Sequence, residues 1–190
     1  MISGSARFLR WLVTGFALVA VAACGSIDDE PQVHADPAAA KIVPVDAADA
    51  RERINEVRRR HGAPPLTAMP VLQDVANAYS LTMARKGKMA HSFGPGTHLR
   101  DRLKGVVAFS LAAENLGAGQ DSVDRLVRLW LESPGHRRNL LDTELTHFGL
   151  GRAINPTARY KAFWTLILIR PPSTPPGGGA TPMHGLRPTG

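Results

Sequence analysis

The chain has 190 residues with 23 lysines and arginines, 16 aspartates and glutamates, and a formal net charge of +7. Its one cysteine excludes a scaffold held by internal disulfides, so the stability of the fold must come from an apolar core. About 145 residues lie between an N-terminal leader and a C-terminal tail, which is a normal size for one domain.

The N-terminus has the layout of an export signal, because Arg7 and Arg10 precede a weakly polar to apolar stretch at 11–23. That stretch is shorter than the ~20 residues that span a bilayer, so we expect a signal and not a permanent transmembrane helix. Its end, Val21-Ala22-Ala23-Cys24, resembles the lipobox of bacterial lipoproteins. The resemblance implies that residues 1–23 are removed and that a lipid on Cys24 anchors the protein to the extracytoplasmic face of a cell membrane. The alternative is an ordinary Ala-x-Ala cleavage site with a cysteine nearby by chance.

Removal of residues 1–23 would leave 21 basic and 16 acidic side chains, a net charge of +5. For an exported protein the natural anionic partners are phospholipid headgroups and wall polymers, whereas nucleic acid lies in another compartment. We therefore expect no nucleic-acid partner. The alternative is that the basic excess is only a solvated surface.

The two ends of the remaining chain have compositions that do not favour a packed core. Residues 24–45 combine four acidic residues and three prolines with few large apolar side chains, and we expect a flexible stalk there. Residues 171–190 contain six prolines and five glycines and are expected to be a disordered tail. The folded domain is therefore predicted to span residues 46–170.

The first half of this domain shows two helical patterns. Asp46 suits an N-cap, and apolar residues follow it at helical spacing until Gly62 and two prolines end the helix. A second helix is expected to begin at Pro70 and to end at Gly87. Its apolar residues recur at intervals of three and four: Leu72, Val75, Ala76, Tyr79 and Met83.

The second half is expected to contain shorter elements. The glycine and proline content of residues 91–96 predicts a loop, residues 97–104 a short helix, and residues 106–109 a short β-rich segment. A third helix is predicted from Val123 to Ser133, after a turn at 117–119, and Ser133-Pro134 predicts the start of a further short helix.

Two strands are predicted at the end of the domain, at 148–154 and 160–169. The second contains a nearly continuous apolar run, which is typical of a strand buried on both faces. Helices followed by a closing hairpin favour an α+β or three-layered domain.

Three polar residues in turn-rich segments have side chains that can bind metal or transfer protons: His91, Glu114 and His136. Two neutral imidazoles and a carboxylate suffice for a three-ligand zinc site with one open position. Alternatively, the carboxylate can orient and charge one histidine. Their spacing is not that of a local ligand motif, so the sequence pattern alone does not show that they converge.

The order of short segments around these residues resembles the CAP superfamily of cysteine-rich secretory proteins, antigen 5 and plant pathogenesis-related proteins. The similarity covers residues 46–169, essentially the whole domain. The matching segments are Asn55 and Arg58 with Gly62 and Leu66, His91-Ser92, Ala113-Glu114-Asn115, Trp130 with Ser133-Pro134-Gly135-His136-Arg137, Phe148-Gly149-Leu150-Gly151, and Phe163-Trp164-Thr165.

This resemblance implies an α+β fold, a three-layer α/β/α sandwich with a small, mostly antiparallel central sheet. It also implies a cleft lined by two histidines and two acidic residues, of which His91, Glu114 and His136 match three. The fourth position holds Ser133, and the nearby acid, Glu132, stands one residue earlier. One residue along a helix turns a side chain by about 100°, so Glu132 is not expected to replace the missing carboxylate. His98 and His147 fall outside the matched positions and are expected on surface connections.

Three functions are compatible with these features. The favoured one is a non-catalytic binding module, anchored to the membrane, that holds a divalent metal such as zinc and a lipid, wall component or protein partner. The alternative is a metal-dependent hydrolase in which His91 and His136 are ligands and Glu114 is a third ligand or general base. A purely architectural role is the third. The sequence assigns no catalytic residue.

Overall fold

The structure is a computed structural model that describes residues 34–173. The expected signal at 1–23, Cys24 and residues 174–190 of the expected tail lie outside the described residues. No helix within 34–173 is long and apolar enough to cross a membrane.

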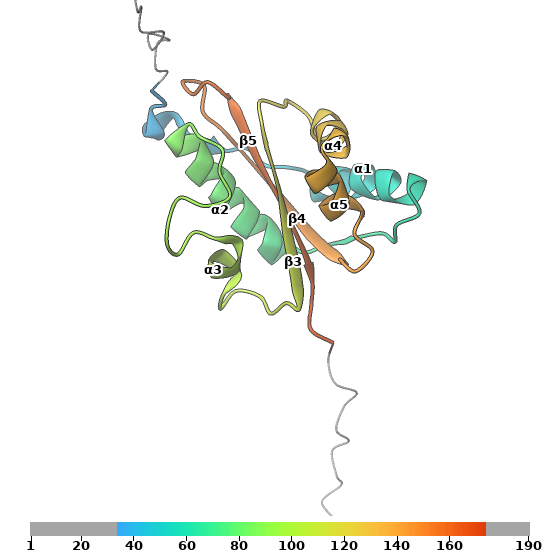
Figure 1. Ribbon diagram of the computed structural model, residues 1–190. Helices are drawn as coiled ribbons and strands as arrows, with labels where there is room; N and C mark the ends of the chain where they lie inside the picture. Colours follow the sequence, from blue (N-terminus) through green and yellow to red (C-terminus); the bar gives the residue numbers. More distant parts are fainter. Residues whose placement is uncertain (1–33, 174–190) are drawn as a thin grey trace, which may run out of the picture. The chain divides into compact units, whose positions relative to one another are not determined.

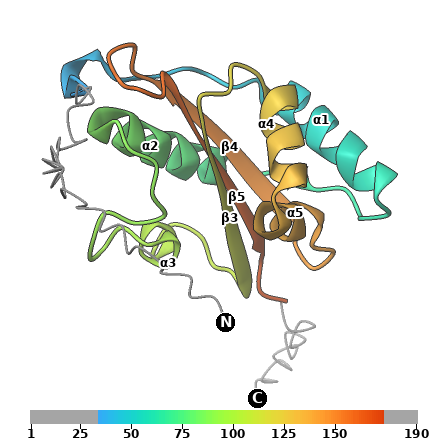
Figure 2. The same ribbon diagram turned by 45° about the horizontal axis from the view of Figure 1, so that its top comes forward.

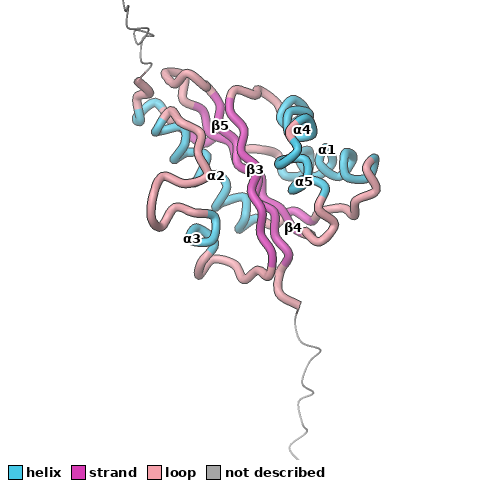
Figure 3. The backbone as a smooth tube through the Cα atoms, in the orientation of Figure 1, coloured by secondary structure: helices cyan, strands magenta, loops and turns pink. Residues whose placement is uncertain are grey.

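A five-stranded sheet forms the centre of the domain, with three long strands that lie side by side (Figures 1 and 3). The strands β4 (His147–Ile154) and β5 (Ala162–Arg170) form the predicted antiparallel hairpin, and β3 (Leu111–Ala118) pairs antiparallel with β5. The short strands β1 (Lys41–Ile42) and β2 (Thr67–Ala68) pair with β4, antiparallel and parallel respectively.

Helices cover both faces of the sheet (Figure 2). On one side lie α2 (Pro70–Lys86) and α3 (Leu99–Leu103). On the other lie α1 (Ala47–Arg60), α4 (Val123–Glu132) and α5 (Pro134–Leu141). The expected α+β fold with a mostly antiparallel sheet between helical layers is therefore confirmed.

Strand β5 is the central element of the core, and eight of its nine residues are buried. Trp164, Leu166 and Leu168 belong to the cluster that includes α1, α4 and α5. The intervening Ile167 and Ile169 pack with Leu72 and Ala76 of α2. The predicted burial of this strand on both faces is confirmed, and the alternation of its side chains divides the core into two layers.

Local signals set the helix ends as predicted. The Asp46 side chain accepts hydrogen bonds from the backbone N–H groups of Ala48 and Asp49, and so caps α1. Helix α2 begins at Pro70 and ends at Gly87, whose φ of 60° suits a glycine C-cap. Ser133 precedes Pro134 at the start of α5, although its side chain makes no capping hydrogen bond.

Close contact between α2 and β4 explains why positions 149 and 151 are glycines. A Cβ on Gly149 would lie 2.3 Å from the backbone nitrogen of Gln73, and one on Gly151 would lie 2.3 Å from that of Asn77. Only a residue without a side chain therefore fits at these positions, which bring the helix directly onto the sheet.

Two expectations about the fold were wrong in detail. Residues 106–109 form no strand; the strand is β3 at Leu111–Ala118, which also includes part of the expected turn at 117–119. The small and polar residues of β3 have little β propensity, and their backbone is extended because it pairs with β5 along its whole length.

The expected stalk at 24–45 is also partly ordered. The 3₁₀ helix η1 (Pro37–Ala39) and β1 belong to the domain, and Asp36 N–H donates to Thr157 Oγ1 at 2.8 Å. Backbone hydrogen bonds fix this segment, and composition gives no information about them. The described part of the domain thus begins before Asp46.

Candidate functional site

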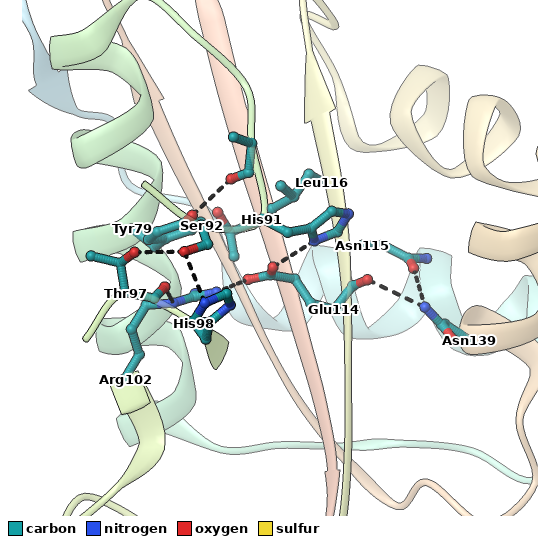
Figure 4. A network of polar contacts seen from close by, with 12 residues as sticks. Tyr79, His91, Ser92, Thr97, His98, Arg102, Glu114, Asn115, Leu116 and Asn139 are labelled. Atoms are coloured by element: carbon teal, nitrogen blue, oxygen red, sulfur yellow. Dashed lines mark hydrogen bonds and ion pairs between the residues drawn. The ribbon is translucent and has the colours of Figure 1, made fainter. Parts of the chain in front are cut away.

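Glu114 lies at the centre of a polar network between β3, α3 and the loop that follows α2 (Figure 4). Its Oε1 is 2.8 Å from His91 Nδ1, and its Oε2 accepts from Arg102 Nη2 at 2.6 Å. The Glu114 side chain is 4% exposed and that of Arg102 is 10% exposed. Both carboxylate oxygens are therefore engaged, one by each partner.

Arg102 is held in place by α2 and by the loop before α3. Its guanidinium carbon lies 3.5 Å from the ring centroid of Tyr79, and its Nε donates to the Thr97 carbonyl at 3.0 Å. The Tyr79 hydroxyl donates to the Ala90 carbonyl at 2.7 Å, next to His91. Burial raises the pKa of Tyr79, so this hydroxyl remains a donor at neutral pH.

His91 presents its imidazole to solvent above this buried pair, with 63% of the side chain exposed. A carboxylate accepts from the protonated nitrogen of a neutral imidazole, so the contact with Glu114 assigns the proton to Nδ1. The lone pair of Nε2 is then free to accept a proton or bind a metal ion.

His136 lies in the first turn of α5, at the other side of β3. Its carbonyl accepts from Asn115 Nδ2 at 2.9 Å, and its own Nδ1 is buried with no hydrogen-bond partner among the described residues. Burial lowers the pKa of His136, and the positive charge of a protonated His91 lowers it further. The imidazole of His136 is therefore neutral at neutral pH.

A cleft of about 600 Å³ opens beside His91 and Glu114. Its lining combines polar and charged side chains with apolar ones from α3 and from the start of β3. The lining residues are His91, His98, Leu99, Arg100, Phe109, Ser110, Leu111, Ala112, Ala113, Glu114 and Asn139. Such a mixed wall suits a ligand with a polar or anionic group and an apolar part.

The predicted site residues are thus placed in different ways. The structure joins His91 to Glu114 directly, whereas His136 does not line the cleft and is linked to His91 only by the effect of a charged His91 on its pKa. Glu132 is exposed and lines a separate surface hollow with Gly119 and Gln120. Ser133 stands at the N-cap of α5 and, like Glu132, does not line the cleft.

Other residues of the site were not anticipated. His98, expected on a surface connection, is exposed but also lines the cleft, with Nε2 3.4 Å from Ser92 Oγ. No local sequence pattern identified Arg102 and Tyr79 as site residues, because their roles depend on contacts between separate elements. Asn139 of α5 also lines the cleft, and its side chain donates to the Asn115 side chain at 3.0 Å.

Glu114 was expected either to bind a metal ion directly or to orient a histidine, and the structure fits only the second role for a metal site. Within residues 34–173 no three His, Cys, Asp or Glu side chains are grouped so that they could hold a metal ion. Glu114 does not fit as a direct ligand, because Arg102 and His91 occupy its oxygens. It fits as the carboxylate that orients a metal-binding histidine, with imidazole nitrogens as the protein ligands.

Comparison with known proteins agrees with this architecture. The chain is 32% identical over 101 residues to the uncharacterized protein YkwD of Bacillus subtilis (strain 168), a match that covers 53% of this chain and 39% of YkwD. It is 30% identical over 123 residues to the uncharacterized membrane protein YlbC of the same organism, covering 64% of this chain and 36% of YlbC. The chain therefore spans less than two fifths of the length of each of these relatives.

Two solved structures share the fold. An extracellular protein with an SCP domain from Bacillus anthracis superposes with a TM-score of 0.57 at 32% identity, over 65% of this chain and 40% of the other. An outer surface protein from Borrelia burgdorferi superposes with a TM-score of 0.60 at 21% identity, over 70% of this chain and all of the other. Residues 51–168 match the cysteine-rich secretory protein family, and the chain therefore belongs to this CAP family.

Proposed function

We propose that this protein is an extracytoplasmic binding module, anchored by a lipid on Cys24, whose cleft binds its ligand through the imidazole of His91. One observation carries the proposal: an exposed imidazole rests on a buried carboxylate that is itself neutralised by Arg102, at the edge of a cleft. Relatives described as an extracellular protein, a membrane protein and an outer surface protein support the placement outside the cell.

The two histidines would bind a divalent metal ion, and zinc is the preferred candidate. His91 Nε2 and the His136 imidazole would hold it, and Glu114 would orient His91 and strengthen it as a ligand. The lowered pKa of His136 favours this role, because only a neutral imidazole binds metal. The metal would offer a coordination position to an oxygen or nitrogen donor of the ligand.

The apolar wall of the cleft favours a ligand with a hydrocarbon portion. Leu99, Phe109 and Leu111 are among its lining residues. A lipid-like molecule or an acylated wall component would place its polar group at His91 and its apolar part on this wall. The same geometry permits a small polar ligand that uses only the histidine side.

Native mass spectrometry of the protein purified from membranes tests this function, because it detects bound metal and co-purified lipid together. We expect zinc to bind and to raise the Tm of the wild type, and His91→Asn and His136→Asn each to lower zinc affinity at least tenfold. His147→Asn is the matched control, since the His147 ring contacts Thr146 and, among the described residues, takes no part in the hydrogen bonds of Glu114. Equal affinity in all three variants would contradict metal binding at this site.

The anchor is tested separately by Cys24→Ser. We expect this variant to appear in the soluble extracytoplasmic fraction, whereas the wild type sediments with membranes. A wild type that is soluble without detergent would show that the anchor is wrong, whatever the cleft binds.

A second function, hydrolysis, is favoured by the contact between His91 Nδ1 and Glu114 Oε1, which is the arrangement of a general base. Among the described residues no serine or threonine hydroxyl contacts the His91 ring, so the nucleophile would be water. The base would be His91 and not Glu114. Hydrolysis of an ester or amide substrate that persists unchanged in both His91→Asn and Glu114→Gln would exclude this role.

A further inference from the structure

Three segments that are distant in the sequence meet at one end of the domain: the first described residues, the end of α2 and the turn between β4 and β5 (Figure 1). The buried Asn155 connects them, because its Nδ2 donates to the carbonyls of Asp36 and Ala84, each at 2.9 Å. A Cβ on Gly87 would lie 2.6 Å from that of Ala35. The place where the chain enters the fold is therefore fixed beside the end of α2.

This end of the domain is rich in exposed positive charge. Four exposed cations lie on the two segments next to the entry point: Arg85, Lys86, Lys88 and Lys161. Within residues 34–173 none of the four forms an ion pair, whereas Arg53, Arg59, Arg60, Arg125 and Arg170 all do. The carboxylate of Asp36, the acid nearest in sequence to the entry point, accepts from the backbone of Ala38 and caps η1.

Exposed apolar side chains accompany these cations. Tyr160, in the turn between β4 and β5, is 44% exposed, and Met89, just after α2, is 43% exposed. The guanidinium of Arg159 lies 6.0 Å from the centroid of the Tyr160 ring. An aromatic ring with a hydroxyl, beside long cationic side chains, is the composition typical of protein surfaces at the headgroup region of a bilayer.

The length of the chain places this surface near the anchor. Cys24 precedes His34 by ten residues, so a lipid on Cys24 can lie no more than about 35 Å from the start of the described fold. A basic patch beside a lipid anchor is a common second contribution to membrane binding. Each Lys or Arg near an anionic surface adds favourable electrostatic energy.

We propose that the entry face, defined as Arg85, Lys86, Lys88, Tyr160 and Lys161, docks onto anionic phospholipid headgroups of the membrane that holds the Cys24 lipid. The inference rests on the proposed anchor for its orientation. Ala113 of the cleft pairs with Leu168, six residues along β5 from Ala162 at the docked end, a distance of about 20 Å. His91 follows Lys88 by only three residues, so the histidine side of the cleft lies next to the docked face.

Vesicle sedimentation tests the entry face without the lipid. The chain from residue 24 onward, with Cys24→Ser, is mixed with vesicles of phosphatidylcholine or of phosphatidylcholine with one quarter phosphatidylglycerol. We expect binding to the anionic vesicles only, weakened at least tenfold in the combined variant Arg85→Gln, Lys86→Gln, Lys88→Gln and Lys161→Gln. Tyr160→Ser should weaken binding less and leave its salt dependence unchanged.

A matched control removes the same charge from other parts of the surface. It substitutes exposed arginines of α1, α4 and α5 with glutamine, and all four lie across the sheet from α2: Arg51, Arg128, Arg137 and Arg138. We expect its vesicle binding to change by less than threefold. Equal loss in the control would mean that net charge alone drives binding and would overturn the entry face, as would no binding of the wild type to anionic vesicles.

The experiments also distinguish binding to a membrane from binding to a soluble polyanion, and both from anchoring by the lipid. Stronger binding to soluble polyphosphate than to anionic vesicles would assign the face to a wall polymer and overturn the membrane proposal. If the anchor is wrong, the wild type is soluble in cell fractions. If the entry face is wrong, the Cys24→Ser chain, which has no lipid, fails to bind anionic vesicles. The two failures are therefore distinguishable.

Discussion

Arg102 and Glu114 form a buried ion pair, with Nη2 and Oε2 2.6 Å apart, directly beneath the exposed imidazole of His91. The pair keeps a carboxylate in the interior of the domain next to a histidine that solvent can reach. It is the structural basis of the site, since Glu114 can orient His91 only while Arg102 compensates its charge.

Loss of one member of this pair should destabilise the fold strongly. Arg102→Met leaves the Glu114 carboxylate buried with only His91 as a partner, and we expect the free energy of unfolding to fall by about 3–5 kcal/mol. The double variant Arg102→Met with Glu114→Gln should recover much of this loss, because no charge is then left uncompensated. Urea denaturation measures both, and additive effects of the two substitutions would contradict the coupling.

The titration of His136 should depend on His91. Burial and the charge of a protonated His91 both lower the pKa of His136, so His91→Asn should raise that pKa toward the ordinary value of about 6.5. NMR titration of the imidazole protons measures the change. His147→Asn is the control, and an equal shift in both variants would rule out direct coupling of the two histidines.

The same lowered pKa makes the stability of the domain depend on pH. Because the unfolded chain binds a proton at His136 more readily than the folded one, the contribution of His136 is present above about pH 6.5 and is lost as pH falls through the folded pKa. We expect His136→Asn to lose less stability than the wild type between pH 7.5 and pH 5 in urea titrations. A loss of equal size would show that other groups cause the pH dependence.

Arg58 should be among the residues whose loss is most damaging. It is fully buried, and its guanidinium donates to the carbonyls of Pro64, Leu140, Asp142 and Leu145. Arg58→Met leaves these carbonyls without their donor, and we expect a loss of about 3 kcal/mol or more in urea denaturation.

The neighbouring Arg59 is the matched control for that substitution. It is exposed, and within residues 34–173 it pairs only with Glu56, one turn earlier on α1. Arg59→Met should therefore cost less than about 1 kcal/mol. Similar losses for the two variants would mean that helix propensity, and not the buried hydrogen bonds, accounts for the effect.

Gly151 should tolerate no side chain, because an added Cβ would meet the backbone of α2 at 2.3 Å. We expect Gly151→Ala to destabilise the domain by about 1–3 kcal/mol or more, as overpacking forces α2 from the sheet. Gly135 of α5 has no atom within 4 Å of an added Cβ, so Gly135→Ala should be neutral or slightly stabilising. Thermal unfolding of the two variants compares them directly, and equal Tm values would contradict the close contact.

Much of the fold follows from local signals in the sequence. Asp46, Gly87 and Pro134 mark helix ends because caps and first-turn prolines act on residues only a few positions apart. The apolar run of β5 predicts its central place because a strand buried on both faces needs apolar side chains on both. For the site, the family resemblance supplied His91, Glu114 and His136.

Tertiary structure alone decided how those residues are used. Glu114 is the partner of His91 and Arg102, and not a free ligand, because the register of β3 against β5 and the position of α3 bring three separate segments together. Likewise, Asn155 holds Asp36 beside α2, so part of an expected stalk belongs to the domain. The sequence determines which residues can form helices, strands and polar contacts, because these preferences are local. It does not reveal which distant groups satisfy one another, because that depends on distances that exist only once the layers have packed.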